Sequence, residues 1–171
     1  MSDMIPQTRA ADHDTQDFML TWVSLVHAGS YLPAALSQHL QERLGISLAE
    51  QDLLKQLGVA GGELTMGELS RRIYLSKAGI TKMMDRLEAG GFVKRVRPAG
   101  DRRIIHARLT KAGRDTLDAS RKLLVPWVRE NLGDHLSTGQ LRSLGKALET
   151  LLKAHDRWEG QMAHLAGQPG T

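Results

Sequence analysis

The sequence between residues 61 and 114 constrains the fold more than any other part of the chain, because it holds several local signals with no spare residues between them. Thr65 is followed three residues later by Glu68, which is the spacing of a capping box at the start of a helix. Ser76 is a good N-terminal cap for a second helix over about 77–89. We therefore expect two short helices separated by a tight turn.

A β-hairpin is expected directly after the second helix. Gly90-Gly91 would end that helix in a left-handed conformation. The runs 92–97 and 104–109 are β-branched or alternating, and they flank the turn-forming sequence Pro98-Ala99-Gly100-Asp101. This order predicts a winged helix-turn-helix, in which the second helix enters the major groove of DNA and the hairpin, called the wing, lies on the backbone beside it.

Positive charge is concentrated in the same segment. Residues 65–114 hold thirteen Lys and Arg but four Asp and Glu, a net charge of +9, whereas the whole chain is +4 and the remainder is therefore −5. A basic module on a mildly acidic body is typical of a phosphate-binding lobe. A solvated charged helix face is the alternative for any single residue. The candidate DNA contacts around the second helix are Ser76, Lys77, Ala78, Thr81, Lys82 and Arg86.

Two long amphipathic segments flank this lobe. In 14–44, apolar positions recur three or four residues apart and form one stripe on a helix, which Gly29 and Pro33 should bend or loosen. The segment 137–166 shows the same alternation, and so regular a seam usually packs against another helix. We expect these segments to join two copies of the chain, with the candidate dimerisation residues Phe18, Leu141, Leu144, Leu148, Leu151, His155 and Trp158.

The chain is thus expected to be mainly α with a small β-hairpin wing, a winged helix-turn-helix lobe on an all-helical dimerisation frame. Three further helix starts carry capping signals, namely Ser47 with Glu50, Thr110, and Ser137 with Gln140. The helix that follows Thr110 should be interrupted or kinked near Pro126. The expected divisions are flexible tails at 1–13 and 167–171, a helical dimerisation region at 14–46 and 110–166, and the DNA-binding lobe at 47–109.

Composition excludes several classes of protein. The absence of cysteine rules out disulfides and thiolate zinc sites and is compatible with a reducing cytosol. No stretch approaches the roughly 20 apolar residues that span a bilayer, so we expect a cytoplasmic protein without a membrane partner. The histidines lack metal-site spacing, and no phosphate loop, nucleophile motif or paired catalytic carboxylates occur. We therefore expect no metal, no other cofactor and no enzymatic activity.

Three short motifs in the lobe carry a resemblance. They are Asp-Arg-Leu-Glu at 85–88, Asp101 followed by Arg102 and Arg103, and Leu-Thr-x-x-Gly at 109–113. Together they resemble the MarR family of bacterial transcriptional regulators. The resemblance implies a homodimer with interlocked terminal helices that represses a neighbouring gene and releases DNA when a small molecule binds between lobe and dimer frame.

The resemblance also assigns roles at the turn of the wing. It implies that Arg103 enters the minor groove and that Asp101 holds its guanidinium, with Arg102 beside them. The planar guanidinium fits groove acceptors and phosphates better than an ammonium does. An ordinary surface ion pair is the alternative. Tyr74 departs from the family, because many relatives have glycine in the turn between the two helices.

An effector site is expected on the first long helix, close to where the resemblance places family pockets. Trp22, Val26, His27 and Tyr31 lie on neighbouring turns there. A large ring with a hydrogen-bonding edge, and a histidine as donor to a carboxylate, would suit a small, flat, anionic aromatic or phenolic effector. The alternative is that Trp22 belongs to the core.

The sequence therefore predicts a ligand-responsive repressor that binds a pseudopalindromic operator on double-stranded DNA as a homodimer. The alternative is an architectural or protein-contact winged-helix protein with little sequence choice. Lys77, Thr81 and Lys82 at exposed positions of the second helix favour base reading, since an architectural binder would carry its basic residues more evenly.

Overall fold

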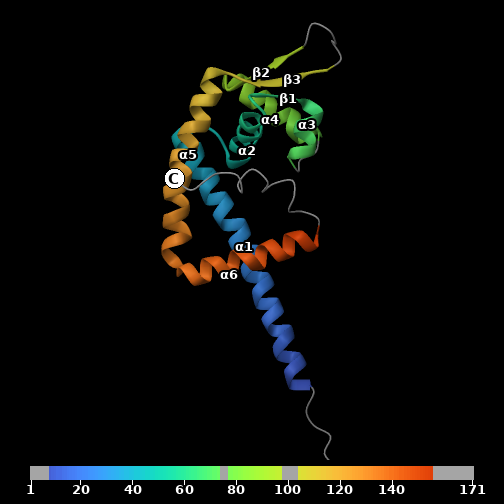
Figure 1. The fold of residues 1–171 in the computed structure, drawn as a ribbon, viewed down its shortest axis with the longest axis vertical. Coiled ribbons are helices and arrows are strands. Elements are labelled where there is room, and N and C mark those ends of the chain that lie inside the picture. Colours follow the sequence, from blue (N-terminus) through green and yellow to red (C-terminus); the bar gives the residue numbers. More distant parts are fainter. Residues whose placement is uncertain (1–7, 74–76, 98–103, 156–171) are drawn as a thin grey trace, which may run out of the picture.

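The computed structural model of the chain describes residues 8–73, 77–97 and 104–155. Figure 1 shows a lobe of short helices and a small sheet at one end, with long helices running away from it. The elements of the lobe are α2 (Leu48–Val59), β1 (Glu63–Thr65), α3 (Met66–Arg72), α4 (Lys77–Ala89), β2 (Val93–Val96) and β3 (His106–Leu109). The long helices are α1 (Thr8–Leu44), α5 (Lys111–Asn131) and α6 (Thr138–Ala154), and a short 3-10 turn, η1 (Gly133–His135), separates the last two.

The helix starts follow the capping signals of the sequence. At α3, the backbone N–H of Glu68 donates to the Thr65 hydroxyl at 3.1 Å, and the Thr65 N–H donates to the Glu68 carboxylate at 2.8 Å. That backbone hydrogen bond is the main reason why the pKa of Glu68 lies below its ordinary value. The capping boxes expected at the starts of α2 and α6 are also present, and Thr110 caps α5. These predictions are confirmed.

The sheet of the lobe has three antiparallel strands in the order β1-β3-β2. The hairpin of β2 and β3 was expected, and it pairs Val93 with Leu109. The first strand was not expected, because three residues are too few to show an alternating pattern. It forms because β3 supplies its partners, with Glu63 opposite Arg108. The predicted hairpin is therefore confirmed, and β1 adds a third strand to it.

The core of the lobe lies between α2, α3, α4 and the sheet. Its centre is formed by Leu53, Leu54 and Leu57 of α2 together with Leu69 of α3 and Met84 of α4, all of them fully buried. Gly91 ends α4 with a φ of 75°, a left-handed conformation that glycine adopts without strain. This core fixes α4 with one face inward and one face outward.

Gly113 fixes the way in which α5 leaves the lobe. A Cβ at this position would lie 2.0 Å from the carbonyl oxygen of Phe92, so only glycine allows the first turn of α5 to approach the start of β2 so closely. The Thr110 hydroxyl also donates to the carbonyl of Gly91 at 2.7 Å. The Leu-Thr-x-x-Gly motif is thus a packing joint between the wing and α5.

The long helices differ from expectation at their ends and at one proline. Helix α1 begins at Thr8, so part of the expected tail at 1–13 is helical. Helix α5 runs through Pro126 without interruption, because a proline at an exposed position removes only one helical hydrogen bond, and a kink at this residue stays a prediction. The described part of α6 ends at Ala154; Trp158 and the rest of the predicted seam and tail over 156–171 lie outside the described residues.

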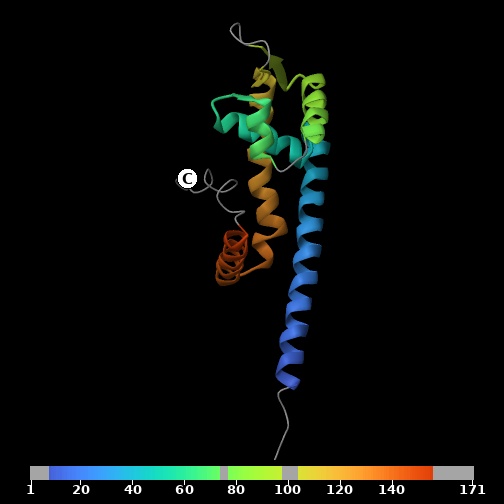
Figure 2. The same cartoon turned by 90° about the vertical axis from the view of Figure 1, so that its right-hand side faces the viewer.

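The lobe and the long helices meet at the C-terminal third of α1. Leu36 and Leu40 are buried there, and α1 contacts both α2 and α5. Beyond this junction α1 continues away from the lobe. Figures 1 and 2 together show that α6 also lies apart from the lobe. In the described part of the chain, no helix is both long enough and apolar enough to traverse a bilayer.

Candidate nucleic-acid interface

Helix α4 presents an outward face that is suited to DNA. It buries Ile80, Met84 and Leu87, while Ala78, Thr81, Lys82 and Arg86 are exposed. This is the face predicted from the sequence. Lys77 begins the helix, but its side chain is not among the described ones, and Ser76 lies outside the described residues.

Arg95 joins the wing to α4. Its guanidinium lies 2.6 Å from the Glu88 carboxylate and 2.7 Å from that of Asp85, and it also donates to the carbonyl of Thr81 at 3.3 Å. The backbone N–H of Arg95 donates to Glu88 at 2.8 Å and is the main reason why the pKa of Glu88 lies below its ordinary value. Strand β2 and α4 are therefore held as one unit. These contacts were not predicted, because in the sequence Arg95 is only one of many basic residues.

Arg86 joins α4 to α2. Its Nε lies 3.1 Å from a carboxylate oxygen of Glu50, which is only 3% exposed and also belongs to the capping box of α2. The side chain of Arg86 is itself 58% exposed, so one side of its guanidinium meets the protein and the other meets solvent. A role for Arg86 in contacting DNA stays a prediction, and the structure adds a role in positioning the helix.

The base of the wing is held by a second set of charged groups. Glu63 on β1 accepts from Arg108 Nε at 2.5 Å and lies 2.8 Å from His106 Nδ1, both on β3. The hydrogen bond from Arg108 is the main reason why the pKa of Glu63 lies below its ordinary value. The predicted tip of the wing, with Asp101, Arg102 and Arg103, lies outside the described residues, and its role stays a prediction.

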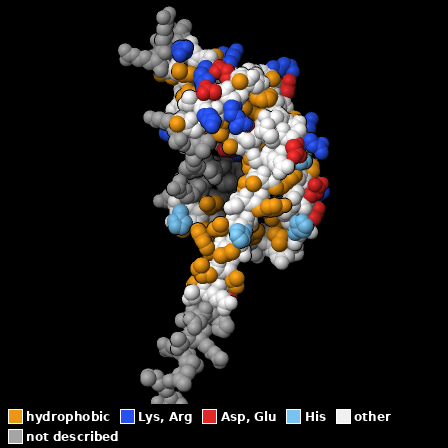
Figure 3. Space-filling view, turned by 180° about the vertical axis from the view of Figure 1, so that it is seen from behind, with side chains coloured by type: hydrophobic (Ala, Val, Ile, Leu, Met, Phe, Trp, Pro, Cys, Tyr) orange, Lys and Arg blue, Asp and Glu red, His pale blue; other side chains and the backbone are white. Residues whose placement is uncertain are grey.

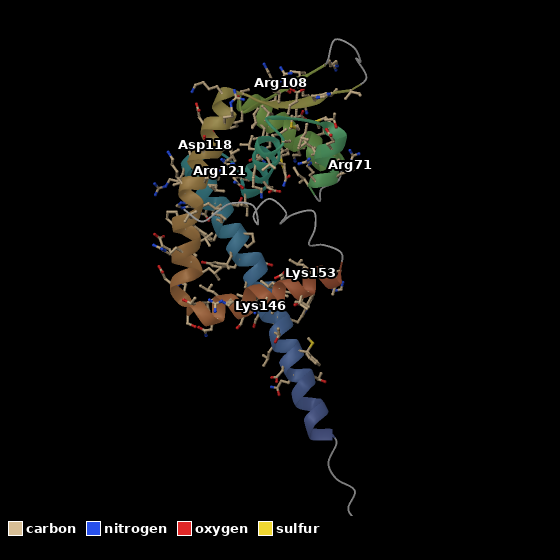
Figure 4. All side chains as sticks on the ribbon, viewed as in Figure 1. Arg71, Arg108, Asp118, Arg121, Lys146 and Lys153 are labelled. Atoms are coloured by element: carbon tan, nitrogen blue, oxygen red, sulfur yellow. The ribbon has the colours of Figure 1, made fainter. Side chains whose placement is uncertain are left out.

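Basic side chains gather at the lobe end of the molecule. Figure 3 shows Lys and Arg around the lobe, and hydrophobic side chains along the helices below it. In Figure 4, Arg71 on α3 and Arg108 on the sheet lie at the lobe, whereas Lys146 and Lys153 lie on α6. In the described ranges, Lys82 and Lys94 make no ion pair, unlike Arg86 and Arg95. Their charges are therefore available to phosphates.

Comparison with known proteins agrees with this geometry. Residues 34–104 match the model of the MarR family. Over 90 residues the chain is 32% identical to the uncharacterized HTH-type transcriptional regulator YdgJ of Bacillus subtilis (strain 168), an alignment that covers 53% of this chain and 54% of that protein. The chain thus spans no more than about half the length of the curated relatives that it matches. Residues 34–104 of the chain are thus similar to the MarR family.

Solved structures show the same fold over almost the whole length of the chain. Sco3205 of Streptomyces coelicolor, a MarR family regulator in complex with DNA, has a TM-score of 0.73 and 24% identity, with 90% of this chain and 91% of that chain covered. The organohalide-sensing regulator RdhR-CbdbA1625, in its 2,4-dichlorophenol-bound form, has a TM-score of 0.72 and 17% identity, with 94% of both chains covered. At these identities the similarity establishes the fold alone.

A groove opens at the junction of the lobe and the long helices. Its volume is about 730 Å³. It lies between the α1 residues from Pro33 to Ser37, residues 48–56 of α2 and Leu124 of α5. An effector was expected at this junction, but on other residues. Gln51 and Gln56, which line the groove, were not singled out, because two glutamines on a helix carry no distinctive signal.

The predicted effector residues lie on a different part of α1. Trp22 is 60% exposed in the single chain, and Val26, His27 and Tyr31 are exposed as well. The part of α1 that lines the groove begins at Pro33, beyond all four of them. Trp22 is therefore not in the core of one subunit, and its assignment to an effector site stays a prediction that requires a second subunit to cover it.

The predicted dimerisation residues are also uncovered in the single chain. Phe18 is exposed on α1, and α6 buries none of its residues, although Leu141, Leu144, Leu148 and Leu151 recur along it at helical spacing. His155, just beyond the end of α6, is exposed too. The frame thus carries two apolar surfaces that nothing in the described part of the chain covers.

Proposed function

We propose that this chain is a cytoplasmic transcriptional regulator that binds a double-stranded operator and represses a neighbouring gene until an effector releases it. One observation carries the proposal: the exposed face of α4, with Ala78, Thr81 and Lys82, is held beside the wing by the ion pairs of Arg95. A rigid helix with short side chains and a lysine on its outer face can reach base edges while neighbouring cations hold phosphates.

We further propose that the regulator is a homodimer. Large apolar side chains left in water over an extended surface mark an interface. Two copies related by a two-fold axis would present two identical α4 helices, and such a dimer reads half-sites about one helical turn apart, roughly 10 base pairs. The exposed apolar residues that support this surface are Phe18, Met19, Leu20, Trp22, Val23, Leu25, Val26, Leu144, Leu151 and Leu152.

The proposed effector is a small aromatic or phenolic molecule that binds at the junction of lobe and frame. The groove between α1, α2 and α5 is of the size that takes such ligands, which is about 300–1,000 Å³. Binding would release DNA only if the ligand prefers a spacing of the two lobes that no longer fits successive major grooves. Trp22 stays a candidate wall of the site in the dimer, and Trp22→Phe in a promoter-release titration tests it.

Footprinting on the promoter of the chain's own gene tests the proposed function. We expect two protected stretches about one helical turn apart, arranged as an inverted repeat. Lys82→Ala should weaken the protection, whereas Lys146→Ala, an exposed lysine on α6 far from the lobe, should leave it unchanged. Protection spread evenly over any duplex would favour the architectural alternative instead.

A further inference from the structure

We infer that the effector of the groove between α1, α2 and α5 is an uncharged molecule with hydrogen-bonding groups, selected by the carboxamides of Gln51 and Gln56. The inference rests on the proposed function, since it names the class of ligand for that groove. It replaces the anionic effector expected from the sequence with an uncharged one.

Two buried side chains carry this inference. Gln51 and Gln56 are 6% and 4% exposed, and both line the groove. Within residues 8–73, 77–97 and 104–155, neither carboxamide makes a hydrogen bond. A carboxamide offers two N–H donors and a carbonyl acceptor, and burying it without partners is unfavourable. A ligand that supplies a donor and an acceptor would remove this cost.

The positions of the two carboxamides suit a ligand lying between them. On α2, Leu48, Asp52 and Lys55 follow one another at helical spacing and form the middle of the groove wall. Gln51 borders this strip on one side and Gln56 borders it on the other, because they are five positions apart on the helix. A flat molecule against α2 would therefore have a carboxamide at each edge.

The charges of the groove favour an uncharged ligand. The one cation among its described lining residues is Lys55, and its Nζ lies 2.6 Å from Asp52 Oδ1, so its charge is already balanced. The hydroxyl of Ser37 already accepts the N–H of Leu48 at 3.1 Å. The other lining residues are small or apolar. A carboxylate entering the groove would lose its hydration and meet Asp52 without gaining an unpaired cation.

Calorimetric titration of the purified full-length chain with two matched probes tests the inference. The probes are 4-hydroxybenzamide and 4-hydroxybenzoate, which share a ring and a hydroxyl but differ in charge at neutral pH. We expect the amide to bind at least about tenfold more tightly than the carboxylate. Gln51→Met and Gln56→Met keep the length of the side chain and remove its hydrogen bonding, so each should weaken amide binding about tenfold. Neither should change the binding of the carboxylate.

Thermal unfolding without a probe separates selection from a packing role. If the carboxamides are unpartnered, either substitution should raise Tm, because it removes a buried polar group that lacks a partner. A carboxamide that holds the fold together would give a lower Tm instead. Gln41→Met, at an exposed position of α1, is the matched control and should change neither Tm nor binding of either probe.

Several outcomes would overturn the inference. They are equal affinity for the two probes, no binding of either probe, unchanged amide binding in both variants, or a lower Tm in both. A groove filled by a second copy would prevent binding of both probes and make Gln51→Met change the dimer dissociation constant. Promoter binding measured without a probe keeps the two proposals apart. If the chain does not bind the promoter, the proposed function is wrong. If it binds the promoter but does not prefer the amide probe, only this inference is wrong.

Discussion

Arg86 on α4 and Glu50 on α2 form an ion pair of 3.1 Å across 36 positions of sequence, and the carboxylate is buried whereas the guanidinium is half exposed. The pair fixes the outward-facing helix to the part of α2 that also borders the groove. A shift of α2 on ligand binding would therefore be transmitted directly to α4.

The first prediction concerns the stability of this contact. Arg86→Ala leaves the buried carboxylate of Glu50 without its cation, so it should lower the free energy of unfolding by about 1–3 kcal/mol. Lys82→Ala, at an exposed position of the same helix without an ion pair in the described ranges, should change it by less than about 0.5 kcal/mol. Urea denaturation measures both, and equal effects would show that the Arg86–Glu50 pair does not hold the helix.

The second prediction concerns the joint between wing and helix. Arg95→Ala removes the guanidinium contacts with Asp85, Glu88 and the Thr81 carbonyl of α4, so the strands of the wing should open more often. We expect faster hydrogen exchange of the β2 amides and promoter binding weakened by about 1–2 kcal/mol. Arg97→Ala, at an exposed position just beyond β2, is the control for loss of charge alone. The joint is refuted if both variants exchange at the wild-type rate.

The sequence revealed local capping signals but not contacts between residues that are far apart in the chain. The starts of α2, α3, α5 and α6 were predictable, because a cap and its partner lie three residues apart. The contacts of Arg86 with Glu50 and of Arg95 with Glu88 were not, because nothing in either neighbourhood marks a partner brought near by folding. Strand β1 was missed for the same reason.

The frame helices show a second limit of the sequence. The apolar stripe of α1 was visible, but its pattern does not distinguish a core within one subunit from an interface between two. In the single chain, Leu36 and Leu40 of this stripe are buried in the core, whereas Trp22 is exposed, so only the N-terminal part of the stripe lies outside the core of one subunit. The lining of the groove was not predictable, because Gln51 and Gln56 become distinctive only through their burial.

The third prediction concerns Gly113. Gly113→Ala places a Cβ against the Phe92 carbonyl oxygen, which cannot move without disturbing β2, so we expect a loss of at least about 2 kcal/mol in unfolding free energy. Gly67→Ala in α3 meets only ordinary contacts and should be neutral or stabilising by up to about 1 kcal/mol. If Gly113→Ala were as stable as the wild type, the first turn of α5 could move away from Phe92 at little cost, and the close contact would not be required.

The fourth prediction concerns pH. The pKa values of Glu63, Glu68 and Glu88 are all lower in the folded chain than the ordinary value of 4.5. A carboxyl group whose pKa is lower in the folded state stabilises the fold at pH values above its pKa in the unfolded state. That stability is lost as the pH falls through the pKa of the folded state. The urea midpoint should therefore decline below about pH 4.5, the ordinary value of these carboxyls. Glu88→Gln should reduce the decline, whereas Glu149→Gln on α6 should not.

The fifth prediction concerns the dimer. Leu148→Glu puts an unpaired charge into the proposed seam of α6 and should weaken association by several kcal/mol. Lys146→Glu changes an exposed neighbour and should leave association intact. Sedimentation velocity distinguishes monomer from dimer for both. A wild-type dimer in Leu148→Glu would remove α6 from the interface.

Competition binding at the lobe is the most direct test of the central claim, that α4 and the wing read a DNA sequence. Fluorescence anisotropy would compare a duplex from the chain's own promoter with a shuffled duplex of equal length and composition, at fixed salt near the physiological concentration. We expect the promoter duplex to bind at least about 1,000-fold more tightly. Arg103→Ala should cost about 1–3 kcal/mol of that affinity. Equal affinity for the two duplexes would contradict the account.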